Sequence, residues 1–385
     1  MRIGVLVETA DGERRVATSP EGAERLTAMD HDVVIESQAG TGAGFTDDAY
    51  RSAGAQVGSR ESVLRDFDIL LQVRGSGTHD RDDGIAEALG ADRTLIALLD
   101  PIWKPANCAR LASTGASIIA LELVPRITRA QSMDVLSSQA TVSGYEAVLL
   151  AATMAPSMFP MLMTAAGTIT PTRVFVLGAG VAGLQAIATA KRLGAVVDAY
   201  DVRPAAGEQI RSLGAKAVEL QIDTHDSEGA GGYAKAQSED QNRAQQDLLS
   251  PVIADADVVI TTAAIPGAAS PQLVTAAMVA NMRPGALVVD LAAERGGNCE
   301  VTVVDEIVDH GGVTVIGPTH LASRSPRSAS RMLSNNICAL LDHLTTEGEV
   351  HLDPDDEITG AMLVASGGDI CHQRTLEALS KAERS

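Results

Sequence analysis

Short apolar runs alternate with helix-period segments along the first third of the chain. Each run is five or six residues long, which is typical of a strand buried on both faces. The segments between the runs, among them 20–29 and 104–112, place apolar residues at helical spacing. Strands that alternate with helices predict a parallel sheet with crossover helices, and hence an α/β domain. The predicted strands are 3–7, 31–35, 68–73, 94–99 and 117–121.

A second alternating series begins at Arg173. It predicts a second α/β domain, so the expected fold class is α/β, with two Rossmann-like, doubly wound parallel-sheet domains separated by a cleft. An apolar-periodic helix over 329–344 follows, and then an acidic stretch, 351–357, before a loosely patterned end. The predicted strands of this series are 174–177, a run ending at Asp201, 215–218, 257–261, 286–290 and 313–316.

Two segments depart from this alternation. Residues 147–172 carry no charge and are long enough to suggest a membrane span, but Pro156 and Pro160 interrupt them. We therefore predict a buried interdomain helix with its exit loop, and no direct membrane insertion. Residues 221–243 hold three glycines, Gly229, Gly231 and Gly232, beside Tyr233. They predict a lid over a bound ligand, and a solvated loop without a task is the alternative.

Composition narrows the class of protein. Of 385 residues, 45% are hydrophobic and 21% charged, as in a soluble α/β protein, while 2% aromatic content predicts aliphatic cores. A net charge of −20 argues against nucleic acid and anionic membrane surfaces as partners. The four cysteines and eight histidines show no metal-ligand spacing, so we expect reduced thiols, no metal site and a cytoplasmic protein. The start of the chain reaches Glu8 too soon to form a signal peptide.

The strongest motif is a glycine turn between a strand and a helix, Gly178-Ala179-Gly180-Val181-Ala182-Gly183. Gly178 permits the tight turn, Gly180 lets the backbone approach a pyrophosphate, and Gly183 lets helix and strand pack closely. The phosphates of a dinucleotide would then meet the free N–H groups of a helix that starts near Val181. Glycines used only for packing are the alternative, which the complete strand, turn and helix context makes less favourable.

Asp201 bears on which dinucleotide binds. A carboxylate at the end of the second strand accepts hydrogen bonds from a ribose 2′-hydroxyl but repels a 2′-phosphate. Two like charges about 4 Å apart cost on the order of 4 kcal/mol at an effective dielectric constant of about 20. NAD is therefore favoured over NADP, although Arg203 is the kind of residue that accommodates a 2′-phosphate.

A further segment, Ala264, Pro266 and Gly267, follows the strand at 257–261. We expect these residues to line the nicotinamide side of the site, unless Pro266-Gly267 is simply a turn.

Six blocks in a fixed order carry a resemblance along nearly the whole chain. The chain resembles the NAD(H)-binding α subunit, domain I, of proton-translocating NAD(P) transhydrogenase, and more distantly alanine dehydrogenase. The blocks are PRITRAQSMDVLSSQ from Pro125, FPMLMTAAGT from Phe159, GAGVAGLQAIATAKRLGA from Gly178, GGYAK from Gly231, TTAAIPG from Thr261 and DLAAERGGNC from Asp290.

The resemblance implies a site and a domain arrangement. In this family Arg126, Gln131, Asp134 and Ser137 belong to a loop beside the nicotinamide, which contacts its carboxamide and positions the ring. Hydride transfer needs two rings held face to face rather than an acid or a base. The expected domains are 1–136 with 320–385, and 137–319 for NAD binding. The expected NAD(H) contacts are Gly178, Gly180, Val181, Ala182, Gly183, Asp201, Val202, Arg203, Gly232, Tyr233, Thr262, Ala263, Ala264, Pro266 and Gly267.

The resemblance also implies partners. These are a second copy of the chain in a homodimer, a subunit that binds NADP(H), and a small membrane subunit that would hold this chain on the cytosolic face of the inner membrane. From its chemistry alone, Arg126 could instead be a surface cation that pairs with Asp134.

Two other functions stay open at this stage. An alanine dehydrogenase would use an arginine, a lysine, a histidine and an aspartate at four positions, where this chain has Arg15, Arg74, Asp100 and Glu294. Arginine cannot exchange protons as lysine does, and an aspartate would repel a carboxylate substrate, so this activity is disfavoured. A non-catalytic NAD-binding module would share the glycine turn and Asp201 but would not need the loop at 126–137.

Overall fold

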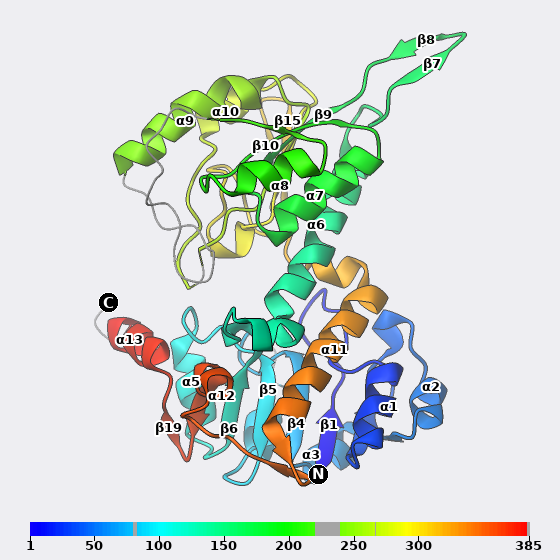
Figure 1. Ribbon diagram of the computed structural model, residues 1–385, viewed down its shortest axis with the longest axis vertical. Coiled ribbons are helices and arrows are strands. Elements are labelled where there is room, and N and C mark those ends of the chain that lie inside the picture. The colour runs from blue at the N-terminus through cyan, green and yellow to red at the C-terminus, as the bar shows by residue number, and fades with distance from the viewer. Residues whose placement is uncertain (80–82, 220–238, 266, 383–385) are drawn as a thin grey trace. The chain divides into compact units, whose positions relative to one another are not determined.

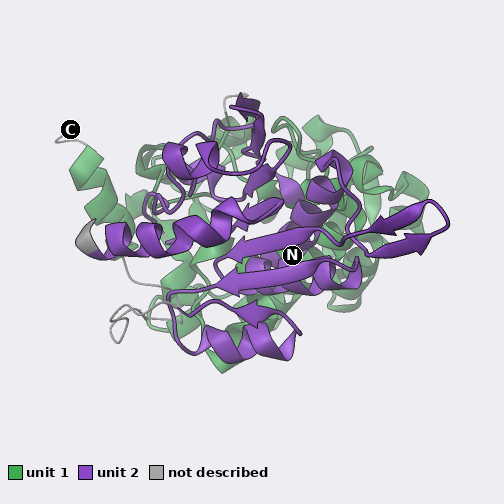
Figure 2. Ribbon diagram, turned by 90° about the horizontal axis from the view of Figure 1, so that it is seen from above, with its two compact units in different colours: residues 1–139, 322–385 green, residues 140–321 purple. Residues whose placement is uncertain are grey.

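The computed structural model describes residues 1–79, 83–219, 239–265 and 267–382 (Figure 1). The described chain forms two compact units, which Figure 2 shows in separate colours. Unit 1 comprises Met1–Gln139 and Ala322–Ser385, and unit 2 comprises Ala140–Leu321. Each unit is built around its own twisted sheet, as expected from the two alternating series.

The sheet of unit 1 has eight strands in the order β19-β18-β6-β5-β4-β1-β2-β3. Strands β1 to β6 are parallel, whereas β18 and β19 join the edge at β6 in antiparallel orientation. The sequence did not predict β3, β18 or β19. The strands are β1 (Arg2–Val5), β2 (Asp32–Glu36), β3 (Gln56–Gly58), β4 (Ile69–Arg74), β5 (Thr94–Leu98), β6 (Ser117–Ala120), β18 (Leu363–Ser366) and β19 (Asp369–Ile370).

Helices cover both faces of this sheet, which explains why its strands are continuously apolar. In β4, Ile69 and Leu71 belong to the core under α1 and α11, while Leu70 belongs to the core under α3 and α5. Figure 1 shows α1 and α11 packed side by side. The helices of unit 1 are α1 (Pro20–Ala28), α2 (Asp47–Ser52), α3 (Arg60–Arg65), α4 (Ile85–Ala88), α5 (Pro105–Ala112), α11 (Pro326–Leu344), α12 (Glu357–Met362) and α13 (Gln373–Ala382).

The sheet of unit 2 has seven strands in the order β11-β10-β9-β12-β13-β15-β14. All are parallel except the edge strand β14, which the sequence did not predict. The strands are β9 (Arg173–Leu177), β10 (Val196–Tyr200), β11 (Lys216–Ala217), β12 (Val258–Thr261), β13 (Leu287–Asp290), β14 (Ile307–His310) and β15 (Val313–Ile316). The helices are α7 (Val181–Arg192), α8 (Ala206–Ser212), α9 (Glu239–Ala254) and α10 (Ala276–Ala280).

Helix α6 (Val135–Met154) begins in unit 1 and ends in unit 2. It starts at Val135, earlier than predicted, and ends at Met154, so the second half of 147–172 lies beyond the helix, where its exit loop was expected. That half contains an exposed hairpin, β7 (Leu162–Thr164) and β8 (Gly167–Ile169), which projects from the rest of unit 2 in Figure 1. Across the described residues, no helix is both long enough and apolar enough to span a membrane.

A small two-stranded ladder completes the fold of unit 1. It joins β16 (Thr345–Thr346) to β17 (Glu349–Val350) directly after α11. The acidic stretch 351–357 and the end expected to be loosely patterned together contain α12, β18, β19 and α13. Ser330 and Ser334 of α11 accept hydrogen bonds from the backbone N–H groups of Val16 and Ser19, so the helix is fixed to the amino-terminal segment of unit 1.

Candidate functional site

The glycine turn joins β9 to α7 in unit 2. Gly178 has a φ of 98°, a conformation that favours glycine. A Cβ on Gly183 would overlap the carbonyl oxygen of Gly178, so only glycine allows α7 to start this close to the strand. The two glycines therefore have the mechanical roles that the spacing predicts.

Gly180 leaves the space above the helix open. It is the N-cap of α7, and a Cβ built there meets no atom within 4 Å. No side chain among the described residues caps this helix end, so its first N–H groups have no side-chain acceptor there. Free amides and the positive end of the helix dipole suit a pyrophosphate, which means the turn fits a dinucleotide.

Asp201 follows β10 and lies beside the same turn. Its carboxylate accepts hydrogen bonds from the backbone N–H of Ala179 at 2.7 Å and of Arg203 at 2.9 Å. The Arg203 guanidinium adds two more, through Nε at 2.8 Å and Nη2 at 2.9 Å. The turn, the acid and the arginine that the sequence singled out are thus in direct contact, with Val202 between them and half-buried.

The segment after β12 approaches the turn from the next strand. Thr262 donates its hydroxyl to the carbonyl oxygen of Gly178 at 3.0 Å. The side chain of Asn298 holds Ala263 at both ends of its backbone, accepting from its N–H at 2.9 Å and donating to its carbonyl oxygen at 2.8 Å. Gly267 has a φ of 73°, which confirms a turn there, whereas Pro266 lies outside the described residues.

Asn298 itself is held by Asp290, at the end of β13. The buried Asp290 carboxylate accepts from the N–H groups of Asn298 and Cys299 and from the hydroxyls of Thr261 and Thr302. Sequence reasoning missed Asp290 and Asn298 as site residues. Two polar residues that follow an apolar strand inside the block DLAAERGGNC were the available signal.

Gly144 of α6 is a third residue that sequence reasoning missed. A Cβ on Gly144 would overlap the carbonyl oxygen of Ala182, in the first turn of α7. The glycine therefore lets α6 pack directly against the helix end that carries the open amides. Gly232, Tyr233 and most of the expected lid, 221–243, lie outside the described residues.

The expected nicotinamide loop lies in unit 1. Arg126 and Gln131 are exposed, while Asp134 and Ser137 are half-buried and bonded to each other. Asp134 accepts from the Ser137 hydroxyl at 2.6 Å and from its N–H at 2.8 Å, which is the geometry of an N-cap. Asp134 therefore begins α6, and this role is additional to any contact with a ligand.

Arg15, the residue matching the arginine of alanine dehydrogenases, is engaged by its own chain. It forms a two-point ion pair with Glu13, at 2.7 and 2.6 Å, and is only 6% exposed. Its Nη1 also donates to Gln139 at 2.8 Å. Burial raises the pKa of Glu13, but Arg15 outweighs it and lowers the pKa to about 2, so the pair is charged at neutral pH.

Two further buried acids stand near the carboxyl ends of the strands of unit 1. Glu8 accepts from the N–H groups of Val73 and Arg74, and burial raises its pKa to about 8. Glu122 accepts from the N–H groups of Leu99 and Asp100, and burial raises its pKa to about 7. Glu8 and Glu122 therefore bind the backbone of Arg74 and Asp100, at or near the positions where the resemblance implies a lysine and a histidine in alanine dehydrogenases.

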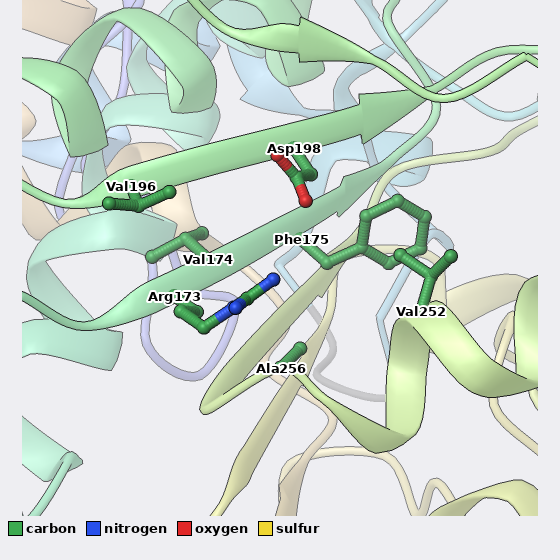
Figure 3. A pocket seen from close by; sticks show the side chains of 7 residues that line it. All are labelled: Arg173, Val174, Phe175, Val196, Asp198, Val252 and Ala256. Atoms are coloured by element: carbon green, nitrogen blue, oxygen red, sulfur yellow. The ribbon is translucent and has the colours of Figure 1, made fainter.

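A small hollow in unit 2 lies away from the glycine turn (Figure 3). It opens at the amino ends of β9 and β10, between Arg173 and Asp198, whereas the turn follows the carboxyl end of β9. Its volume of about 10 Å³ admits roughly one water molecule. It is therefore unrelated to the candidate dinucleotide site.

Comparison with known proteins gives matches along almost the entire chain. Residues 4–143 match the model "Alanine dehydrogenase/PNT, N-terminal domain", and residues 147–373 match "Alanine dehydrogenase/PNT, C-terminal domain". NAD(P) transhydrogenase subunit alpha of Cereibacter sphaeroides is 41% identical over 375 residues, covering 96% of this chain and 71% of that protein. The first part of NAD(P) transhydrogenase subunit alpha from Rhodospirillum rubrum is 40% identical over 383 residues, covering 97% and 98%.

A solved structure agrees with these matches. The transhydrogenase from Sinorhizobium meliloti superimposes with a TM-score of 0.86 at 40% identity, covering 96% of this chain and all of that one. Both sheets of this chain and their connections thus have a close counterpart of known structure.

Proposed function

Because the chain belongs to the alanine dehydrogenase/PNT family, we propose that it is the NAD(H)-binding subunit of a proton-translocating NAD(P) transhydrogenase. A hydride would pass directly between NAD(H) on this chain and NADP(H) on a partner subunit. The open helix end at Gly180 beside Asp201 is the observation that carries the proposal, since together they offer a pyrophosphate and a ribose the groups that each prefers.

The residues of unit 2 have distinct tasks in this proposal. The first N–H groups of α7, from Val181 to Gly183, hold the pyrophosphate. Asp201 and its neighbours Val202 and Arg203 hold the adenosine ribose. The segment from Thr262 to Gly267 lines the nicotinamide side, and its backbone is kept in place by Asn298.

The loop of unit 1 has the positioning role. When bound, NADH supplies the hydride, and the protein needs only to hold the nicotinamide ring in a reactive orientation. We propose that Arg126, Gln131, Asp134 and Ser137 do this through the carboxamide, as the family resemblance implies. The Asp134–Ser137 hydrogen bond keeps the loop in one conformation at the start of α6.

The engaged Arg15 argues against alanine oxidation by this chain. Glu13 occupies the Nε and Nη2 edge of the Arg15 guanidinium, Gln139 accepts from Nη1, and Glu13 would repel the carboxylate of an amino acid. Arg74 cannot exchange protons as a lysine does, and Asp100 would repel the carboxylate of the substrate. The non-catalytic module has no specific observation in its favour.

We also propose the partners that the resemblance implies. A second copy of this chain would form a homodimer, for which the hairpin β7–β8 offers apolar surface: Met161 is 59% and Met163 79% exposed. The other partners would be an NADP(H)-binding subunit and a small membrane subunit. Through them the chain would lie at the cytosolic face of the inner membrane.

The purified chain, mixed with an NADP(H)-binding transhydrogenase subunit, tests the proposal. We expect NADPH to reduce an acetylpyridine analogue of NAD only when both proteins are present. The variant Arg126→Ala should keep its affinity for NADH, measured by nucleotide fluorescence, but lower the transfer rate at least about tenfold. Arg129→Ala, a neighbouring exposed arginine, is the matched control.

Each alternative function predicts a different result. Alanine-dependent formation of NADH by the chain alone would identify a dehydrogenase. NADH binding without transfer in any mixture would identify a non-catalytic module. Absence of NADH binding would reject the dinucleotide site itself.

A further inference from the structure

The carboxylate of Asp201 has no vacant acceptor position. A carboxylate offers about four lone-pair directions. One oxygen accepts from the backbone N–H and Nε of Arg203, and the other accepts from the N–H of Ala179 and from Nη2 of Arg203. The two guanidinium donors are the only ones of these four on a flexible side chain. A ribose hydroxyl can bond to this carboxylate when one of the two withdraws, while the other keeps Arg203 on Asp201.

The same pairing cancels the charge that should exclude NADP. The side chains of Asp201 and Arg203 are 7% and 19% exposed, so the pair is largely shielded from water. A positive charge 2.8 Å from the carboxylate offsets most of its repulsion toward a 2′-phosphate. The charge of Asp201 alone therefore does not account for a preference for NAD.

Arg203 is also tied to the glycine turn. Its Nη2 lies 3.3 Å from the carbonyl oxygen of Ala179, which places the guanidinium between Asp201 and the start of the phosphate-binding segment. Arginine binds phosphate with two parallel hydrogen bonds, and its charge persists at any physiological pH. An arginine at this position would meet a 2′-phosphate as soon as the carboxylate released it.

We propose that Arg203 is a specificity-determining residue of the dinucleotide site. While Asp201 holds it, the guanidinium is withheld from a 2′-phosphate, and the site selects NAD(H). Without the carboxylate, Arg203 binds the 2′-phosphate, and the site accepts NADP(H). This inference rests on the proposed NAD(H) site and adds the group that decides between the two dinucleotides.

A double-mutant cycle tests the proposal by nucleotide binding. Kd values for NADH and NADPH are measured by nicotinamide fluorescence for the natural chain and for Asp201→Ser, Arg203→Ala and the double variant. We expect the natural chain to prefer NADH and Asp201→Ser to bind NADPH at least about tenfold more tightly than the natural chain does. The double variant should lose that gain.

The outcomes separate this inference from the proposed function. If Asp201→Ser binds NADH but does not bind NADPH more tightly than the natural chain, Arg203 is not the selecting group. The same follows if the double variant keeps the increased affinity for NADPH. If the natural chain binds neither nucleotide, the dinucleotide site fails before its specificity is in question. Unchanged circular dichroism and melting temperature show that each variant is folded.

Discussion

Glu122 illustrates how a single buried group shapes the response of the fold to pH. Oε1 of Glu122 accepts two backbone hydrogen bonds, while Oε2 is buried without a partner among the described residues. Burial raises its pKa from 4.5 to about 7, so the folded protein binds this proton more tightly than the unfolded chain does. Stability from this group is complete below about pH 4.5 and is lost as the pH rises through 7.

Glu122→Gln should therefore flatten the pH dependence of stability. The amide keeps the oxygen that accepts the two N–H groups and cannot ionise. We expect the free energy of unfolding of the natural chain to fall by about 1 to 3 kcal/mol more between pH 5 and pH 8 than that of the variant. Urea unfolding followed by the fluorescence of Trp103, the single tryptophan, measures this in unit 1.

The exposed Glu24 of α1 provides the control. Glu24→Gln should leave the slope between pH 5 and pH 8 unchanged. Glu8 has a raised pKa of about 8 for the same physical reason, so some pH dependence should persist in Glu122→Gln. A variant with the same slope as the natural chain would show that Glu122 is ionised in the fold.

Two substitutions of Asn298 test how the segment at Ala263, beside the glycine turn, contributes to stability. Asn298→Ala leaves the N–H and carbonyl of Ala263 and the carbonyl of Pro271 without their partner, so we expect a loss of roughly 2 to 4 kcal/mol in stability. Asn298→Asp keeps the acceptor for the N–H of Ala263 but sets a buried carboxylate oxygen against the carbonyl oxygens of Ala263 and Pro271, so it should lose more. Urea unfolding followed by circular dichroism gives the ranking. A smaller loss in Asn298→Asp than in Asn298→Ala would contradict the two-ended hold on Ala263.

The residues that could be predicted are those whose role is local. Gly178 and Gly183 are needed by the turn itself, and Asp201 lies at a fixed spacing from it. Asp290 and Asn298 act through loops that only the folded sheet brings to Ala263. Their position after an apolar strand marks them as candidates, but which backbone groups they hold depends on contacts between residues far apart in the sequence.

Gly144 carries a prediction at the scale of an element, because it sets the distance between α6 and α7. Replacing a helical glycine by alanine ordinarily stabilises a helix by roughly 0.5 to 1 kcal/mol. Gly144→Ala should instead destabilise unit 2, by about 1 to 3 kcal/mol, because its Cβ overlaps the backbone of Ala182. The affinity for NADH should fall as well, since the shifted turn carries the open amides.

Gly207→Ala in α8 is the matched control for this prediction. Its Cβ would lie 3.4 Å from the flexible end of Arg211, so the helix can accept it. Thermal melting measures the stability of both variants, and NADH titration measures their affinity for the nucleotide. A stabilised Gly144→Ala with unchanged affinity would mean that α6 does not constrain the turn.

The sequence predicted those strands and helices whose buried residues form a regular apolar pattern. The central strands of both sheets are confirmed because each is apolar on both faces. The edge strands β3, β14 and β19 are short or partly exposed, so they leave no apolar run. Helix α6 was predicted to begin too late because its apolar residues surround it, which removes the periodic signal, and Asp134 was not recognised as its N-cap.

The hairpin β7–β8 yields a prediction about the assembled molecule. Met163→Glu places a charge on its most exposed apolar side chain, which is 79% exposed and contributes little to the fold of one chain. We expect the natural chain to be dimeric by light scattering and the variant to be monomeric with an unchanged melting profile. Leu248→Glu on α9, which alters an apolar side chain that is 42% exposed and lies outside the hairpin, should remain dimeric.

At the scale of the whole molecule, the α/β class with two doubly wound sheets is confirmed. The antiparallel additions were not foreseen, because β18 reaches β6 from the far end of the chain. The apolar pattern of residues 363–366 does not indicate which of the two similar sheets β18 joins. Such pairings depend on the tertiary fold and become visible only when it is known.

The strand β18 has a consequence for how the protein is made. The ribosome releases residues 1–139 first, yet their sheet lacks its antiparallel edge and the cover of α11 until residues beyond 322 have emerged. At about 5 to 20 residues per second, synthesis of the intervening segment occupies roughly 10 to 40 seconds. Throughout that interval the nascent residues 1–139 display the apolar surface that α11 later covers, whereas unit 2, which is continuous in sequence, can already complete its own fold.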